Sequence, residues 1–438
     1  MPVFPYRHVT DHCFASAIGP AGLSEAEFRP VLAETAPALD QLRAWHGDGN
    51  HPFLNLPARR DDLPVIEAAA ARFREAFDSV VVLGTGGSSL GGITLTALAQ
   101  PAFGTCGGNA RVHFMENVDG TSFDGLFRGL DLRRTGFIVI SKSGRTTETL
   151  SQFLICLAAM REAVDLDRLN RHFLVVVEPG NNPLRRLAEH RKIPVIDHDP
   201  KLGGRFSALS VTGLLPAMIA ELDATAAREG AFAVLEQTLA AKNPADSHPA
   251  VGAALNMAFH RHRKADSTVV MPYSDQLAPF GLWFRQLWAE SLGKDGKGTT
   301  PIRALGSVDQ HSQLQLYLAG PADKFYTFIT VDCAGTGQVI APDRGLDAEL
   351  DWLVGRTMGD VMYTLQRSTW KTLVQRGRPV RQFRLPVLDA RALGAMMMHY
   401  MLETAIAAHL FGVDPFDQPA VERGKVLARR YLQRIPPR

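Results

Sequence analysis

Segments of helical periodicity alternate with short apolar runs between about residues 64 and 230. The run at 79–83, Ser-Val-Val-Val-Leu, is β-branched and almost continuously apolar, which is typical of a parallel strand buried on both faces. By the same criteria we expect strands at 79–83, 111–115, 136–140, 172–177 and 193–196. The expected helices lie at 65–77, from the turn after residue 89 to Leu98, at 146–160, and at 207–227 with a kink at Pro216. Strands that alternate with helices predict a parallel sheet with helices on both faces.

A second and weaker alternation occupies the later part of the chain. Strands are expected at 268–271, 325–331 and 381–387, and helices at 284–294, 347–373, 388–411 and 422–432. A polar, proline-containing bridge at 228–250 separates the two alternations, so we expect a domain boundary there. The first 60 residues have few strand signals, and Ser24 and Glu27 have the spacing of a helix capping box.

The patterns together predict an α/β protein with two doubly wound, mainly parallel sheets. The expected parts are an N-terminal helical arm (1–60), a first α/β domain (61–230), a second α/β domain (231–395) and a C-terminal helical arm (396–438). The length of 438 residues agrees, because one hydrophobic core seldom supports so long a chain.

The charge balance and the cysteines narrow the function. The 47 lysines and arginines nearly balance the 45 acidic residues, which argues against a nucleic-acid partner but allows a small anionic substrate in one pocket. The cysteines, with no CxxC pair, predict reduced thiols rather than a metal site or redox pair; they are Cys13, Cys106, Cys156 and Cys333. The absence of a signal core or of a long apolar stretch predicts a soluble cytoplasmic protein with no membrane partner.

The segment Ser-Lys-Ser-Gly-Arg-Thr-Thr-Glu-Thr at 141–149 follows an expected strand and opens an expected helix. Hydroxyl groups and free N–H groups can converge there on a phosphate at the positive end of the helix, and Lys142 and Arg145 add charge. We therefore expect a phosphate-binding loop. A Walker A motif is absent, which argues against hydrolysis of a nucleoside triphosphate.

The segment Gly-Thr-Gly-Gly-Ser-Ser-Leu-Gly at 84–91 forms another strand-to-helix turn. Its glycines allow the backbone to approach a ligand. It is not a dinucleotide fingerprint, because Ser89 stands where the third glycine is needed. Alone, the segment also fits a simple tight turn.

Four charged side chains are candidates for proton transfer and charge stabilisation. Glu290 lies one helical turn after Gln286 on the same face, near a glycine- and lysine-rich loop. Arg205 precedes a helix start, where its guanidinium could steady an oxyanion. His311 could exchange protons near neutral pH, and Lys425 lies on the terminal helix. Taken singly, each also fits a solvated charge, a surface ion pair or a structural histidine. The other histidines lack partners at ligand spacing, so no metal is expected.

These stretches together resemble bacterial glucose-6-phosphate isomerase, also called phosphoglucose isomerase. The matching segments span roughly residues 80–430; they are GTGGSSLG at Gly84, SKSGRTTET at Ser141, GGRFSALS at Gly203, QLWAESLGKDGKG at Gln286, DQHSQLQLYLAGP at Asp309 and FDQPAVERGK at Phe416. The resemblance implies two sugar-isomerase (SIS)-type α/β domains with a C-terminal arm. It also implies reversible isomerisation of glucose 6-phosphate and fructose 6-phosphate in glycolysis and gluconeogenesis, without a cofactor.

The resemblance also implies roles for individual residues. Glu290 matches the base that moves a proton between C1 and C2, and Arg205 the arginine that supports the enediolate. His311 and Lys425 match a ring-opening pair whose histidine comes from the neighbouring subunit, which implies a homodimer. Positions that match substrate contacts are Gly87 and Ser88 in the sugar-contacting turn, Gln286, and Ser141, Lys142, Ser143, Thr146 and Thr149 in the phosphate loop.

Two positions depart from the family pattern. Arg145 replaces a threonine beside the phosphate and is expected to alter affinity, whereas Thr85 replaces an isoleucine and is expected to be harmless. Three alternatives stay open: an isomerase that also or instead acts on mannose 6-phosphate, a non-catalytic sugar-phosphate sensor, and a metal-dependent isomerase. A sensor would not need Glu290, His311 and Lys425 together.

Overall fold

Two five-stranded sheets form the framework of the protein. The computed structural model describes residues 4–100, 110–343 and 347–437, so Cys106 lies outside the described residues. The first sheet has the order β3-β2-β4-β5-β6, and all its neighbouring strands are parallel. Its strands are β2 (Ser79–Leu83), β3 (Arg111–Met115), β4 (Thr135–Ile140), β5 (Phe173–Val177) and β6 (Val195–Asp197).

Both faces of the first sheet are buried, as the apolar runs predict. Val80 and Val82 pack with one set of helices, whereas Val81 and Leu83 pack with the other, because successive strand side chains point to opposite faces. The first set comprises α4 (Leu63–Ala76), α5 (Leu90–Ala99) and α9 (Val211–Ile219). The second comprises α6 (Gly120–Gly129), α7 (Thr147–Ala163) and α8 (Pro183–His190). The doubly wound α/β class is confirmed.

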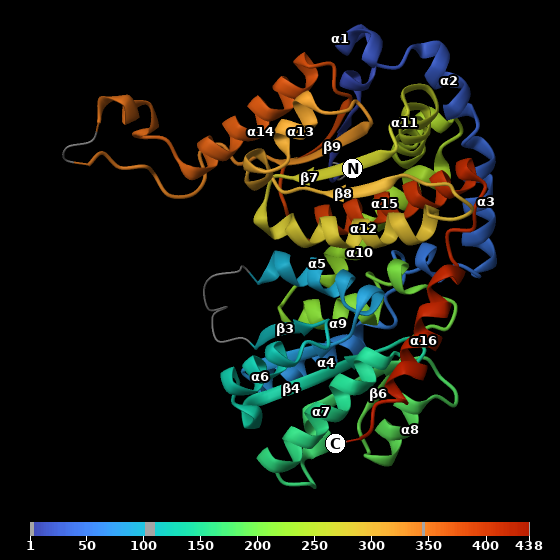
Figure 1. Ribbon diagram of the computed structural model, residues 1–438, viewed down its shortest axis with the longest axis vertical. Coiled ribbons are helices and arrows are strands. Elements are labelled where there is room, and N and C mark those ends of the chain that lie inside the picture. Colours follow the sequence, from blue (N-terminus) through green and yellow to red (C-terminus); the bar gives the residue numbers. More distant parts are fainter. Residues whose placement is uncertain (1–3, 101–109, 344–346, 438) are drawn as a thin grey trace.

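The second sheet has the order β1-β10-β9-β7-β8 and is parallel except for its first strand. Its strands are β1 (Arg7–Val9), β7 (Ser267–Pro272), β8 (Thr300–Arg303), β9 (Lys324–Val331) and β10 (Val380–Leu385). One face packs on α11 (His248–Arg263), α12 (Ala278–Leu292) and α15 (Ala390–Phe411), and the other on α13 (Leu314–Ala319) and α14 (Met358–Gln375). Figure 1 shows this sheet above and the first sheet below, with α12, α10 and α5 between them.

The N-terminal segment is more than the helical arm expected from the sequence. It contains α1 (Ala15–Ile18), α2 (Glu25–Ala33) and α3 (Ala36–Asp48), and Ser24 and Glu27 form the predicted capping box. Before these helices, however, β1 pairs antiparallel with β10. A three-residue strand carries too little periodicity to be recognised, and its partner lies at the far end of the sequence.

Two predicted helices are wrong in extent. The helix expected at 207–227 is broken after α9, because Glu221 takes a left-handed backbone conformation and Asp223 caps a new helix, α10 (Ala224–Ala240). The helix expected at 347–373 is a short 3₁₀ turn (Ala348–Leu353) followed by α14. Gly355 at positive φ and a capping box at Thr357 separate the two.

The polar bridge expected at 228–250 is also wrong, because α10 runs through most of it and joins the two halves. A Cβ on Gly230 would lie 1.8 Å from the Arg391 carbonyl oxygen, and one on Gly394 would lie 1.9 Å from the Ala227 carbonyl oxygen. The backbones of α10 and α15 therefore touch at these glycines. Fully buried Arg228 on α10 also forms a bidentate ion pair with Asp62. Its Nη1 donates to Asp62 Oδ1 at 2.6 Å and its Nη2 donates to Asp62 Oδ2 at 2.8 Å.

A buried polar chain fixes β1 to the second half. Tyr6 Oη lies 2.7 Å from His399 Nδ1, and His399 Nε2 lies 2.8 Å from Glu403 Oε2. Arg381 binds both oxygens of Glu403, at 2.9 and 2.8 Å, and Asn256 Nδ2 donates to Glu403 Oε1 at 2.9 Å. The charges of Arg381 and Glu403 are therefore paired and hydrogen-bonded, which is the condition under which a protein interior tolerates buried charges.

The C-terminal helix α16 (Glu422–Leu432) has no buried residue. In Figure 1 it descends, in red, toward the level of the first sheet. No described helix is both long and apolar enough to cross a membrane.

The buried histidines predict acid sensitivity. Burial, and then the neighbouring charge of His399, lowers the pKa of His248 from 6.5 to about 4. In the unfolded chain the His248 imidazole binds a proton below pH 6.5, whereas in the folded chain it does so only below about pH 4. The free energy of unfolding therefore falls as the pH falls from 6.5 to about 4. Urea unfolding at steps across the window should show a shallower pH dependence for His248→Gln. Exposed His409→Gln is the control and should keep the wild-type slope; equal slopes in all three proteins would contradict the prediction.

Candidate active site

The candidate site begins at the switch point of the first sheet. β2 lies between β3 and β4 in the sheet. The connection after β2 leads to β3 on one side, and the connection after β4 leads to β5 on the other side, so the loops that follow these two adjacent strands diverge. A crevice at the carboxyl ends of such strands is where open α/β sheets bind ligands. The loop after β2 carries Gly87 and Ser88, and the loop after β4 carries residues 141–147.

The loop after β4 is shaped as an anion-binding turn. Ser141 Oγ lies 3.0 Å from Thr146 Oγ1, and Ser143 Oγ accepts a hydrogen bond from the Arg145 N–H at 3.3 Å. Gly144 has a φ of +60°, and a Cβ there would lie 2.0 Å from Asn182 Oδ1. No side chain of the described residues caps the start of α7, which leaves the first N–H groups of this helix able to bind an anion. Thr149, one turn into α7, is buried, and its Oγ1 has no hydrogen-bond partner among the described residues.

The two cations of this loop differ in placement. Lys142 is half-buried, and no described residue forms a hydrogen bond or ion pair with its ammonium group. Burial lowers the pKa of Lys142, and the charges of Glu178 and Asp199 oppose that shift. Arg145 is exposed, and its Nη2 donates to the Asn181 carbonyl oxygen at 3.3 Å.

The turn after β2 packs tightly against the segment that carries Arg205. A Cβ on Gly87 would lie 2.4 Å from the carbonyl carbon of Gly204, and Ser207 Oγ donates to the Gly87 carbonyl oxygen at 3.2 Å. At Gly86 (φ +58°), a Cβ would lie 2.8 Å from Gln286 Nε2. A side chain at either glycine would separate the turn from the residues around Glu290.

Helix α12 presents Gln286 and Glu290 to this turn because its apolar face is buried elsewhere. Phe284, Leu287 and Trp288 lie in the core, and Trp288 Nε1 donates to Thr299 Oγ1 at 2.9 Å. On the other face, Gln286 Nε2 donates to Glu290 Oε1 at 3.2 Å. The Glu290 side chain is 36% exposed, so solvent or a ligand can reach it.

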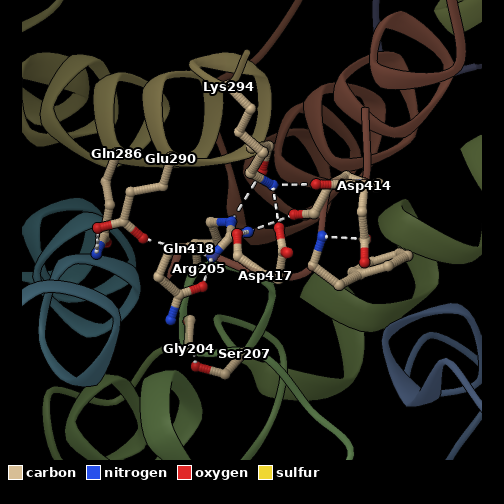
Figure 2. A network of polar contacts seen from close by, with 12 residues as sticks. Gly204, Arg205, Ser207, Gln286, Glu290, Lys294, Asp414, Asp417 and Gln418 are labelled. Carbon is tan, nitrogen blue, oxygen red and sulfur yellow. Dashed lines mark hydrogen bonds and ion pairs between the residues drawn. The ribbon is translucent and has the colours of Figure 1, made fainter. Parts of the chain in front are cut away.

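Arg205 is the most heavily bonded side chain of the site (Figure 2). It is only 3% exposed, and burial lowers its pKa while the charges of Glu290 and two aspartates oppose that shift. Nε donates to Ser291 Oγ at 2.8 Å, and Nη1 donates to Gln418 Oε1 at 2.7 Å and lies 3.4 Å from Glu290 Oε2. Nη2 donates to the carbonyl oxygens of Pro415 and, at 2.9 Å, of Asp417.

Sequence reasoning missed the residues that hold the C-terminal segment over the site. Lys294 Nζ forms an ion pair with Asp417 Oδ1 at 2.7 Å and donates to the Asp414 carbonyl oxygen (Figure 2). Gln418 reaches Arg205 from the same segment. Their signal was present: Lys294 follows Glu290 in one conspicuous motif, and Asp417 and Gln418 open another. Nothing in the spacing, however, indicates that the two motifs meet.

Two predicted catalytic residues are not joined to this group within the single chain. His311 ends a 3₁₀ turn (Val308–His311), is exposed, and has no hydrogen bond or ion pair among the described residues. Lys425 is exposed on α16, where Nζ pairs with Glu422 Oε1 at 2.6 Å. The structure thus brings together Gly87, Arg205, Gln286 and Glu290.

The described residues contain no group of three or more histidine, cysteine, aspartate or glutamate side chains arranged to hold a metal ion. Cys13, Cys156 and Cys333 are unpaired thiols.

Comparison with known proteins decides the family. A family model described as phosphoglucose isomerase matches residues 69–308, more than half of the chain. The chain belongs to the phosphoglucose isomerase family. Glucose-6-phosphate isomerase of Rubrobacter xylanophilus is 38% identical over 379 residues, which cover 85% of this chain and 87% of that protein. A glucose-6-phosphate isomerase of Thermus thermophilus is 36% identical over 419 residues, covering 92% and 97%.

Two solved structures have the same fold as this chain. A hypothetical protein from Thermus thermophilus superposes with a TM-score of 0.85 at 31% identity, covering 98% of this chain and 99% of that one. A glucose-6-phosphate isomerase from Chlamydia trachomatis has a TM-score of 0.73 at 21% identity, covering 98% and 94%. The second likeness concerns the fold alone and matches the predicted class.

Lys294→Met should loosen the segment that encloses Arg205. Asp417 is 55% exposed, so the lost ion pair should lower the free energy of unfolding by only about 1 kcal/mol or less. Amide hydrogen exchange in residues 413–421 should nevertheless accelerate, because both bonds from Lys294 end in that segment. Lys297→Met changes an exposed lysine of the same loop and should leave exchange there unchanged. Equal exchange in both variants would show that Lys294 does not hold the segment.

Proposed function

We propose that this protein interconverts glucose 6-phosphate and fructose 6-phosphate through an enediol or enediolate, with Glu290 as the base. The observation that carries the proposal is the reachable Glu290 carboxylate, hydrogen-bonded to Gln286 and paired with buried Arg205 beside the switch-point turn. The activity named for the family relatives supports the same reaction. A role in glycolysis and gluconeogenesis, in the cytoplasm, follows as part of the proposal.

The chemistry requires one proton to move between neighbouring carbons. Conversion of the aldose to the ketose removes a proton from C2 and returns it to C1, while a second proton leaves the C2 hydroxyl group and one is added to O1, with a planar enediol or enediolate between the steps. A single carboxylate on one face of that plane can perform both transfers at carbon. Glu290 is suited because Gln286 Nε2 orients one oxygen while the side chain stays partly exposed.

Arg205 supplies positive charge next to the developing oxyanion. A guanidinium fixed by neutral oxygens needs little reorganisation when negative charge appears, which is how preorganised groups lower a barrier. Four of its contacts are to Ser291, Gln418 and two backbone carbonyl groups, so its geometry does not depend on Glu290 alone. Buried Gln286 Oε1 has no partner among the described residues and offers an acceptor to a sugar hydroxyl.

The loop of residues 141–149 would hold the phosphate, with hydroxyl groups from Ser141, Ser143, Thr146 and Thr149 and the ammonium of Lys142. Gly87 and Ser88 would contact the sugar from the adjacent loop. Binding the phosphate away from the reacting carbons uses remote binding energy to position C1 and C2. Proton transfer of this kind needs neither a metal ion nor a redox cofactor, and none is proposed.

Ring opening would require a second acid–base pair, for which we propose Lys425 and the His311 of a neighbouring subunit in a homodimer. His311 is exposed and unpaired among the described residues, so it is available to a second copy. Helix α16, which carries Lys425, has no buried residue in the single chain.

Glu290→Gln tests the base while keeping the size of the side chain. Turnover of fructose 6-phosphate should fall by about 10²-fold or more, the lower range for general acid–base catalysis, because an amide cannot accept the proton. Binding of the sugar phosphate, measured by calorimetry, should persist. Exposed Glu75→Gln is the control and should retain activity. Near-normal turnover in the Glu290 variant would refute the assignment, and a parallel assay with mannose 6-phosphate would reveal the related isomerase activity.

Mixing two inactive variants tests whether His311 acts across subunits. In a mixed dimer of Glu290→Gln and His311→Gln, one site receives both changes and the other receives neither. Random pairing of equal amounts should then restore about a quarter of wild-type activity, because half of the dimers carry one intact site. If His311 served its own subunit, both sites of every mixed dimer would be damaged and activity would stay at the level of the separate variants.

A further inference from the structure

A second pocket opens on the α14 side of the second sheet. Its volume is about 270 Å³, and it lies between one stripe of α14 and the carboxyl ends of β9 and β10. The stripe has helical spacing, so its side chains share one face. The lining residues are Thr330, Asp332, Tyr363, Gln366, Arg367, Trp370, Lys371, Gln382 and Arg384. None belongs to the site around Glu290.

The pocket carries uncompensated positive charge. Arg367, Lys371 and Arg384 line it against the single carboxylate of Asp332. No acidic group among the described residues forms an ion pair with any of the three cations. Outside the lining, Arg7 on β1 adds a fourth cation beside Arg384, because the two are register partners and opposite residues of an antiparallel pair share a face. Like charges placed opposite each other repel, and a bound anion would relieve that repulsion.

Arg384 is exposed, but its guanidinium group is held in place by two neighbouring side chains. Gln382, only 4% exposed, accepts hydrogen bonds at Oε1 from Nε at 3.0 Å and from Nη2 at 2.9 Å. The guanidinium carbon also lies 5.7 Å from the centre of the Trp370 ring. An arginine fixed in this way loses less freedom when it binds an anion.

Two polar groups of the lining lack partners. Gln366 is 5% exposed; its Nε2 donates to the Val331 carbonyl oxygen at 3.5 Å, but its Oε1 is buried without a hydrogen bond among the described residues. Trp370 Nε1 is likewise buried and unpaired there. Buried polar atoms are usually satisfied, so unpaired ones beside a cationic pocket indicate a binding surface rather than a filled core.

We propose that this pocket binds a compact metabolite with two or more negative charges. Its size suits a small molecule rather than a nucleotide or a peptide. Arg384 supplies a planar fork that fits either phosphate or carboxylate oxygens, and Lys371 and Arg367 supply charge from the facing helix. Polyphosphates and polycarboxylates both present several negatively charged oxygens to such a pocket. We take pyrophosphate as the test ligand for the first class and citrate for the second.

Calorimetric titration of the full chain with each anion at constant ionic strength tests the proposal. A Lys142→Gln background weakens the loop at 141–149 as a competing phosphate site, and every pocket variant is compared with its control in that same background. In that background, Lys371→Gln together with Arg384→Gln should weaken binding by about tenfold or more, since two charged hydrogen-bond donors are lost. Exposed Lys242→Gln is the control, because it also replaces one lysine by a neutral side chain, and it should leave the affinity for the anion unchanged.

The outcomes separate cleanly. Binding of one anion, lost in the pocket variant, supports the proposal and names the source. Absence of binding by either anion, or equal affinity in the pocket and control variants, overturns it. Lys371→Glu alone is the second variant if the double variant unfolds; it lies on an exposed face and should repel either anion. Isomerase activity plays no part in this readout, so failure of the reaction proposed above would leave the result unaffected.

Discussion

The buried guanidinium of Arg205 is the interaction on which the arrangement of the candidate site depends. A cation removed from water costs several kcal/mol unless its hydrogen bonds and charge are satisfied. Arg205 meets that demand with two separate parts of the chain: Glu290 and Ser291 on α12, and the C-terminal segment through the Gln418 side chain and the carbonyl groups of Pro415 and Asp417. Satisfying one side chain therefore positions both α12 and the C-terminal segment over the first half.

This convergence is possible because the two halves share one hydrophobic core. Helices α4, α5 and α9 of the first half and α11, α12 and α15 of the second contribute to the same buried cluster. Gly230 and Gly394 bring the backbones of α10 and α15 into contact, so even a methyl group at either position would require the helices to separate. The candidate site therefore lies where the two halves pack together, and Glu290 and Arg205 extend from elements that are packed into the core.

The sequence predicted most strands of both sheets, and the clearest were β2 and β4, which are almost continuously apolar. It missed β8, a four-residue strand without an apolar run, and β1, whose pairing with β10 is non-local. It also missed the break before α10, which depends on Glu221 at positive φ. Arg205 and Glu290 could be proposed from their motifs, and the structure places them 3.4 Å apart, whereas their catalytic roles stay a prediction. The contacts of Lys294 could not be inferred, because its partners lie over a hundred residues away. The cross-subunit role of His311 stays a prediction.

The chain from Tyr6 to His399 and Glu403 also has a consequence for protein synthesis. Tyr6 precedes His399 by 393 residues, so Tyr6 is synthesised long before its partner, and β1 likewise waits for β10. Until β10 has emerged from the ribosome, the backbone groups of β1 lack their partner strand. The first sheet can assemble as soon as its own strands emerge, whereas β1 can join the second sheet only after β10. The strand β1 therefore precedes the whole first sheet in the sequence but can take its place only after that sheet has been synthesised.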